Sequence, residues 1–175
     1  MTGILKIATL QADDMLGLVD LVNSAYRGED SKKGWTSEAD LIEGSLRTDL
    51  PALIKILQKP GAAILTCSDD KTLLGCVYLQ QEGTGLYLGM LSVSPAAQGM
   101  GIGKKLLTAS EKHARNLDCN NIFMTVIDVR HELIAWYERH GYTRTGQTKP
   151  FDAEESFGVP KQPLQFIVLK KAIGI

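Results

Sequence analysis

A short glycine-rich segment is the first candidate for chemistry in this chain. In SPAAQGMGIGKKLL, residues 94–107, Gly99, Gly101 and Gly103 lie within five positions, between a strand-like run and a helix-like run. The first N–H groups of a helix have no partner within it, and the helix dipole is positive at that end, so a glycine loop there suits a phosphate. The segment predicts a phosphate-binding loop, although a tight strand-to-helix turn would need similar residues.

Two common phosphate motifs do not fit this segment. The dinucleotide pattern G-x-G-x-x-G would require glycine at position 104 or 106, and a Walker A loop would require glycine at 98 and a hydroxyl at 105. Gln98-x-x-Gly101-x-Gly103 instead resembles the acyl-CoA pyrophosphate loop of the GNAT N-acetyltransferase superfamily. The resemblance implies that acetyl-CoA is the cosubstrate. It also implies that one continuous stretch binds it, formed by Gln98, Gly99, Met100, Gly101, Ile102, Gly103 and Lys104.

A second stretch, RHELIAWYERHGY at 130–142, is similar to the GNAT motif N-x-x-A-x-x-[Leu/Phe]-Y-x-[Lys/Arg]-x-G-[Phe/Tyr]. The matching positions are Tyr137, Arg139, Gly141 and Tyr142. The departures are Arg130, Leu133 and Trp136, which replace asparagine, alanine and leucine or phenylalanine. The resemblance implies that Tyr137 is catalytic and protonates the departing thiolate of coenzyme A. The alternative is a packing tyrosine on an amphipathic helix.

The run LYLGMLSVS, residues 86–94, resembles the fourth strand of the family, which separates from the next strand and pairs with the pantetheine arm of the cofactor. On that match Leu91, Ser92 and Val93 would supply main-chain contacts. A strand that separates from its neighbour leaves N–H groups unpaired, and one of them can stabilise an oxyanion.

The acceptor site is predicted less specifically. In the family it is shaped mostly by the segment joining the first helices, here 26–40, so Trp35 and Glu29 are candidate substrate contacts, together with Tyr87. Trp35 could equally anchor its loop on the core. Residues 86–93 contain no Asp or Glu as general base, and a low-pKa amine or a water chain is therefore favoured. The side chains that remain open as bases are Glu29, Glu38, His131 and Glu132.

The elements that position these residues alternate between strand and helix patterns. Strands are expected at 4–10, 62–68, 73–80, 86–94, 120–128, 142–149 and 164–171, and helices at 13–26, 36–46, 50–61, 102–117 and 131–141. Asp13 and Thr36 or Ser37 are the expected caps of the first two helices. The pattern predicts an α/β (α+β) fold. The resemblance implies a mixed, mostly antiparallel central sheet of about seven strands, flanked by helices, with the cofactor cleft between its splayed fourth and fifth strands.

Composition limits the remaining choices. A chain of 175 residues with 44% apolar residues predicts one globular domain over 1–175. A net charge of −1 argues against nucleic acid and anionic membranes as partners, and no apolar run reaches a membrane span of about 20 residues. Because the first residues lack a basic segment followed by a long apolar one, no signal peptide is expected there. Cys67 and Cys76 lie in apolar runs and are expected to be buried thiols; with Cys119 they form no metal-ligand cluster, so no metal and a cytoplasmic location are predicted.

These observations predict an acyl-CoA-dependent N-acyltransferase. The expected reaction moves acetyl from acetyl-CoA to a primary amine by direct attack through a tetrahedral intermediate. The acceptor can be a small molecule or a peptide amine. A peptide or protein N-acetyltransferase, and a non-catalytic acyl-CoA-binding sensor or regulatory module, are the open alternatives. A homodimer is also left open.

Overall fold

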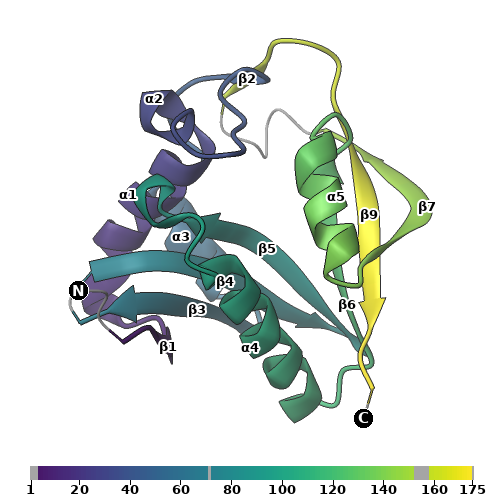
Figure 1. Cartoon of the computed structure of the whole chain (residues 1–175). Coiled ribbons are helices and arrows are strands. Elements are labelled where there is room, and N and C mark those ends of the chain that lie inside the picture. The colour runs from purple at the N-terminus through teal and green to yellow at the C-terminus, as the bar shows by residue number, and fades with distance from the viewer. Residues whose placement is uncertain (1–3, 71, 152–157, 175) are drawn as a thin grey trace.

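A computed structural model describes residues 4–70, 72–151 and 158–174. Its centre is a seven-stranded sheet in the order β1-β3-β4-β5-β6-β9-β7 (Figure 1). The strands are β1 (Lys6–Thr9), β3 (Ala62–Asp69), β4 (Thr72–Glu82), β5 (Gly85–Val93), β6 (Asn121–Ile127), β9 (Gln165–Ala172) and β7 (Thr143–Pro150). Only β5 and β6 pair in parallel. The mixed, mostly antiparallel sheet of the predicted fold class is confirmed.

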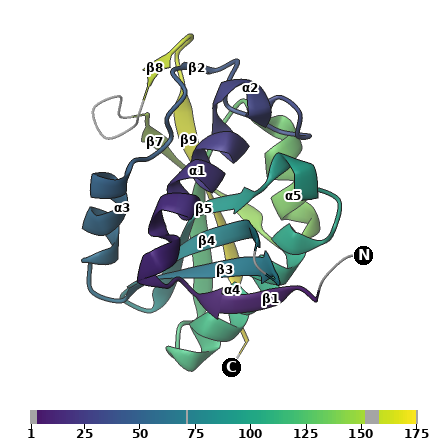
Figure 2. The ribbon, with the colours of Figure 1, turned by 90° about the vertical axis from the view of Figure 1, so that its left-hand side faces the viewer.

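Helices cover both faces of this sheet. The helices are α1 (Met15–Tyr26), α2 (Gly28–Ser31), α3 (Leu50–Leu57), α4 (Ile102–Asn116) and α5 (His131–Arg139), with 3₁₀ turns at Ala12–Asp14 and Pro95–Ala97. Figure 2 shows α1 and α3 lying across the face of β3, β4 and β5, and Figure 1 shows α4 on the other face. Strand β4 is buried on both sides because Cys76 and Tyr78 face the α1 core while Val77 and Leu79 face the α4 core.

Local sequence explains several element boundaries. Asp49 caps α3 by accepting a hydrogen bond from the Ala52 N–H at 2.9 Å, and proline occupies the first turn, where no backbone donor is needed. The thiols of Cys67 and Cys76 are fully buried, as predicted. None of the helices among the described residues has the length and apolar character of a membrane span.

The helix predicted at 36–46 is absent. That segment forms turns and a two-residue strand, β2 (Ile42–Glu43), which pairs antiparallel with β8 (Val159–Pro160). The short helix of this region, α2, lies earlier in the chain, at Gly28–Ser31. The reason is tertiary: the Glu38 carboxylate is drawn into a buried ion pair, which outweighs the local helix propensity. The expected Asp13 cap is also wrong, because residues 12–14 form a 3₁₀ turn and α1 begins at Met15.

Strand β5 separates from β6 part-way along its length. The two strands pair only from Gly85 to Tyr87, opposite residues 121–123. Farther along, the register with β4 shifts between Cys76 and Tyr78, and Met90 adopts a positive φ of 53°. A bulge with a residue in this strained conformation bends a strand, and bulges commonly occur next to functional sites. The splayed pair of the predicted fold class is therefore present.

Candidate active site

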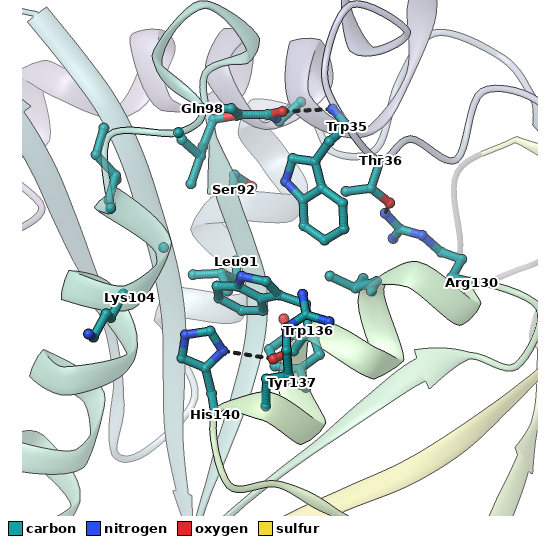
Figure 3. Close-up of a pocket in the computed structure, with 18 of the residues that line it drawn as sticks. Trp35, Thr36, Leu91, Ser92, Gln98, Lys104, Arg130, Trp136, Tyr137 and His140 are labelled. Atoms are coloured by element: carbon teal, nitrogen blue, oxygen red, sulfur yellow. Dashed lines mark hydrogen bonds between the residues drawn. The ribbon is translucent and has the colours of Figure 1, made fainter.

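Two pockets adjoin where β5 and β6 separate. The first, of about 410 Å³, is bounded by the end of β5, the glycine loop and the facing side of α5 (Figure 3). The second, of about 500 Å³, lies among β4, β5, β6, α3 and the end of β7. Five residues line both pockets: Tyr26, Leu91, Arg130, Leu133 and Tyr137. Chemistry between two bound molecules could therefore take place at this shared boundary.

The glycine loop has the conformation that a phosphate cradle requires. Gly99 and Gly101 have φ values of +88° and +77°, which L side chains rarely adopt, and a Cβ at either position would meet open space. Gly101 is the N-cap of α4 and provides no side-chain hydrogen bond, so the first N–H groups of this helix remain available. Six residues of the predicted stretch 98–104 line the first pocket; Met100 does not.

Gln98 ties the loop to two other segments. Its Oε1 accepts from the Trp35 N–H at 2.9 Å, and its Nε2 donates to the Val93 carbonyl at 3.4 Å (Figure 3). A Cβ at Gly34 would lie 2.6 Å from the Gln98 amide oxygen, so the close approach depends on glycine there. The Gln98 side chain thus connects the segment after α2 with the end of β5.

Aromatic rings form the wall opposite the glycine loop. The Trp136 ring centre lies 6.4 Å from that of Trp35 and 4.3 Å from that of His140. A Cβ at Gly103 would lie 3.1 Å from the Trp136 ring. The indole at the position where the family has leucine or phenylalanine therefore packs against the phosphate loop. Trp35, one of the predicted acceptor contacts, lines this first pocket and not the second.

Tyr137 lies at the boundary of the pockets. It is 4% exposed, and its ring packs edge-on against Trp136 and Tyr142. Its hydroxyl has no hydrogen-bond partner among residues 4–70, 72–151 and 158–174. Burial raises the pKa of this phenol well above 10, so it stays protonated at neutral pH. A protonated hydroxyl without a protein acceptor can donate to a ligand.

The unpaired edge of β5 forms the opposite side of the boundary. The Leu91 carbonyl accepts a hydrogen bond from the Tyr26 hydroxyl at 3.0 Å, and burial raises the pKa of Tyr26 to about 12. The Ser92 hydroxyl turns back to the Met90 carbonyl at 2.9 Å and is buried. Leu91, Ser92 and Val93, the predicted main-chain contacts, all line the first pocket, and so does Tyr26, which the sequence analysis did not single out.

The sequence that forms this site matches a known family. Residues 20–142 match the sequence model of the Acetyltransferase (GNAT) family. The chain belongs to the GNAT acetyltransferase family. An acetyltransferase of Agrobacterium fabrum is 29% identical over 89 residues, which span 51% of this chain and 64% of that protein.

Solved structures show the same GNAT fold. The ribosomal-protein-S18-alanine N-acetyltransferase of Escherichia coli has a TM-score of 0.72 at 12% identity, covering 98% of this chain and 96% of that one. A candidate acetyltransferase from Salmonella typhimurium, solved with its cofactor acetyl-CoA, has a TM-score of 0.69 at 17% identity, covering 97% and 94%. At these identities the likeness concerns the fold.

The departure at Arg130 gives this GNAT protein a buried ionic cluster. Arg27 Nε lies 3.1 Å from Glu38 Oε1, Arg130 Nη1 lies 3.1 Å from Glu38 Oε2, and all three side chains are buried. Arg130 Nη2 donates to the Thr36 hydroxyl at 2.9 Å. The cluster fixes the segment after α2 against the start of α5. Arg130, at the motif position where the family has asparagine, thus makes this structural contact.

The candidate bases of this GNAT chain are differently placed. Glu38 is the one candidate base that lines a pocket in the part of the chain described, and its carboxylate is shared by two arginines. Glu132 accepts from Thr36, and His131 is exposed. The Glu29 side chain is 90% exposed, pairs with Lys32 at 3.5 Å, and lies in neither pocket.

The lining of the second pocket combines aromatic rings with charged side chains. Tyr87, one of the predicted acceptor contacts, lines this pocket. The centre of its ring lies 6.2 Å from that of Tyr78 and 5.7 Å from that of Phe123. The charged residues of the lining are Glu38, Arg47, Lys59, Glu82, Arg130 and Lys149. Within the described ranges, no three His, Cys, Asp or Glu side chains gather to hold a metal ion.

Proposed function

We propose that this chain is an N-acetyltransferase that moves acetyl from acetyl-CoA to a primary amine by direct attack. The observation that supports it most is the position of the Tyr137 hydroxyl, which has no hydrogen-bond partner among the described residues and lies between the pocket of the glycine loop and a second pocket. Acetyl-CoA supplies an activated thioester. The backbone from Gln98 to Lys104 would hold its pyrophosphate, and the free edge of β5 at Leu91 to Val93 would hold its pantetheine arm.

Tyr137 has the role of proton donor to the departing thiolate. A thiol has a pKa of about 8.5 when cysteine is its model, so its thiolate leaves readily. The raised pKa of the phenol makes it a weak acid but keeps its proton in place over the whole assay range. Its contribution is therefore at the low end of general acid catalysis. The free N–H groups of β5 would stabilise negative charge on the carbonyl oxygen.

The acceptor amine must be neutral to attack. In the second pocket Arg47, Lys59, Lys149 and Arg130 face only two carboxylates within the described residues. An excess of positive charge lowers the pKa of a nearby amine, because the ammonium form is repelled. The lining can thus favour the neutral amine without a carboxylate dedicated to removing its proton, and Glu38 acts as the anchor of two arginines.

Thiol release from acetyl-CoA, measured with and without amines, tests this function. We expect release that depends on an amine and saturates with both substrates. The panel should contain small amines, amino acids and peptides, since either a metabolite or a peptide can fit the proposal. If acetyl-CoA binds tightly and no amine accelerates thiol release, the chain is an acyl-CoA-binding module and the catalytic proposal is wrong.

We also propose that the protein works in the cytoplasm, since its three cysteines are free and buried.

A further inference from the structure

We propose that the acceptor carries an anionic group near its amine, a carboxylate in the simplest case, and that Arg47 binds this group. The inference rests on the proposed function, because it assigns the second pocket to the acceptor. It names a substrate class, an amino acid or a related amine with a short spacing between amine and anion. It also assigns a specificity-determining residue.

The charges of the second pocket favour such an acceptor. Glu38 is already shared between Arg27 and Arg130, so that buried cluster keeps a net positive charge. Glu82 is exposed at the end of β4, beside the turn to β5. Among the residues that the structure describes, no carboxylate lies within 4.0 Å of the Arg47 guanidinium. A polycationic amine would be repelled here, whereas an anion would find an uncommitted cation.

Arg47 is held in place before any ligand arrives. The Asn23 side chain of α1 accepts from the Arg47 N–H at 2.6 Å and from the Thr48 N–H at 2.9 Å, and it donates to the Thr48 carbonyl at 3.0 Å. The guanidinium lies 5.3 Å from the centre of the Tyr26 ring, a cation–π distance. The Asn23 contacts thus fix the backbone that carries Arg47, while its guanidinium lies against an aromatic ring, and the planar donors of that guanidinium match the two oxygens of a carboxylate.

The position of Arg47 sets how far the anion lies from the amine. The Tyr26 ring has a second guanidinium, that of Arg130, 5.7 Å from its centre, and its hydroxyl reaches the Leu91 carbonyl. Arg47 is thus one aromatic ring away from the boundary of the two pockets. The Arg130 Nε–H is buried and has no acceptor among the described residues, which adds a second uncommitted donor beside the same ring. An amine at the boundary and an anion at Arg47 would both lie beside this ring, and acceptors of increasing chain length measure the spacing between them.

The pairing also favours the chemistry. A carboxylate close to an amine stabilises the ammonium form, which cannot attack. An ion pair with Arg47 offsets that negative charge, so the cationic lining can still lower the pKa of the amine. The same contact therefore selects the acceptor and helps to keep it neutral.

Matched acceptors test the proposal. Glycine, β-alanine, γ-aminobutyrate and a set of L-amino acids are each compared with the corresponding carboxamide, which keeps the amine and removes the charge. We expect kcat/KM to be about 10- to 100-fold higher for the preferred acid than for its amide, the size of one charge-assisted contact. Arg47→Met should remove most of this preference, mainly by raising the acceptor KM, and Arg47→Lys should restore part of it.

The control for overall charge is Arg144→Met. Arg144 lies on β7, outside both pockets, and pairs with Glu138 at 3.5 Å on the surface. This variant removes the same charge and should keep the acid-to-amide ratio of the wild type. Amides or amidated peptides that serve as well as the acids, or a ratio that Arg47→Met leaves unchanged, would overturn the inference while amine acetylation stands.

Failure of the proposed function is separable by direct binding. If no amine is acetylated, calorimetry with N-acetyl amino acids and their amides still measures recognition of the carboxylate. Tighter binding of the acids, lost in Arg47→Met, would support the anion site in a non-catalytic protein. Equal binding of acids and amides would refute it.

Discussion

The two pockets on either side of β5 are built from different parts of the chain. The first is formed largely by the backbone of one continuous loop, residues 98–104, and by one face of α5. The second combines side chains from α1, the segment before α3, and strands β4, β5, β6, β7 and β9. Backbone N–H groups can bind the phosphate of a cosubstrate common to a whole family. Side chains that are far apart in sequence determine which acceptor fits.

This difference explains where mutations should act. A change in the loop should affect coenzyme A with any acceptor, and a change in the second pocket should affect one class of acceptor only. Residues at the boundary, Tyr137 above all, should affect turnover with every acceptor. Variants at these three places should therefore differ in whether coenzyme A binding, the KM of one acceptor class or turnover with every acceptor changes.

Gly101→Glu should have the largest effect, on the first pocket. The side chain would project from a position with φ +77° beside the free N–H groups of α4, and its charge would repel a pyrophosphate. We expect the dissociation constant of coenzyme A to rise at least about 100-fold, or about 2.7 kcal/mol, measured by calorimetry.

Gly146→Glu is the matched control for that change. Gly146 has φ +85° on β7, with open space around a Cβ and no place in either pocket. Both variants should lose about 1 kcal/mol of folding stability to backbone strain, but only Gly101→Glu should lose coenzyme A. Unchanged affinity in folded Gly101→Glu would show that the loop is merely a turn.

The same division decides how much could be predicted from the sequence. The glycine loop and the Tyr137 motif are contiguous patterns, and the order of the seven strands of the central sheet and of α1, α3, α4 and α5 follows from hydrophobic periodicity; all of these were predicted. The bulge at Met90 was not, because a positive φ at a methionine results from packing between strands. The role of Tyr26 was also missed, since its hydroxyl meets Leu91, which is 65 residues away in the sequence.

The missed helix after α2 has the same cause. Residues 36–46 have a capping residue and acids in the first turn, which favour a helix locally. In the Arg27–Glu38–Arg130 cluster, Glu38 pairs with a residue 92 positions away, and no local pattern indicates it. The acceptor side depends on such distant contacts, so the candidates named from the sequence, Trp35 and Glu29, do not lie in the second pocket, whereas Tyr87 does.

Tyr137→Phe should have the next largest effect, at the boundary. We expect kcat to fall about 10- to 100-fold, or about 1.4 to 2.7 kcal/mol in the barrier, with every acceptor. The KM for acetyl-CoA should change little because the ring and its packing against Trp136 and Tyr142 remain. Steady-state kinetics with two unrelated acceptors measures both quantities.

The pH dependence checks the role of the phenol. Because burial raises its pKa above 10, the donor keeps its proton at every lower pH, so the ratio of wild-type to variant kcat should be constant from pH 7 to pH 9. Burial also raises the pKa values of Tyr26 and Cys76 to about 12 in the folded protein. The free energy of unfolding is therefore fully retained below the unfolded pKa values of about 9 to 10 and falls as the pH rises toward 12. Kinetic measurements should for this reason stop near pH 9. A variant as fast as the wild type over this range would make Tyr137 a packing residue.

Trp35→Ala should have the smallest effect, and it decides to which pocket the residue belongs. The side chain is 49% exposed and lines the first pocket beside Trp136, so we expect the acetyl-CoA KM to rise about 3- to 10-fold, within the range of one aromatic contact. The acceptor KM should stay within about twofold, and stability should fall by about 1 kcal/mol or less, since half of the ring is already in water.

Ile54→Ala on α3, another exposed apolar residue outside both pockets, controls for truncation alone. The opposite result, a raised acceptor KM with an unchanged KM for acetyl-CoA, would mean that the loop carrying Trp35 turns toward the acceptor when substrates bind, and the separation of the two pockets would not hold at this residue.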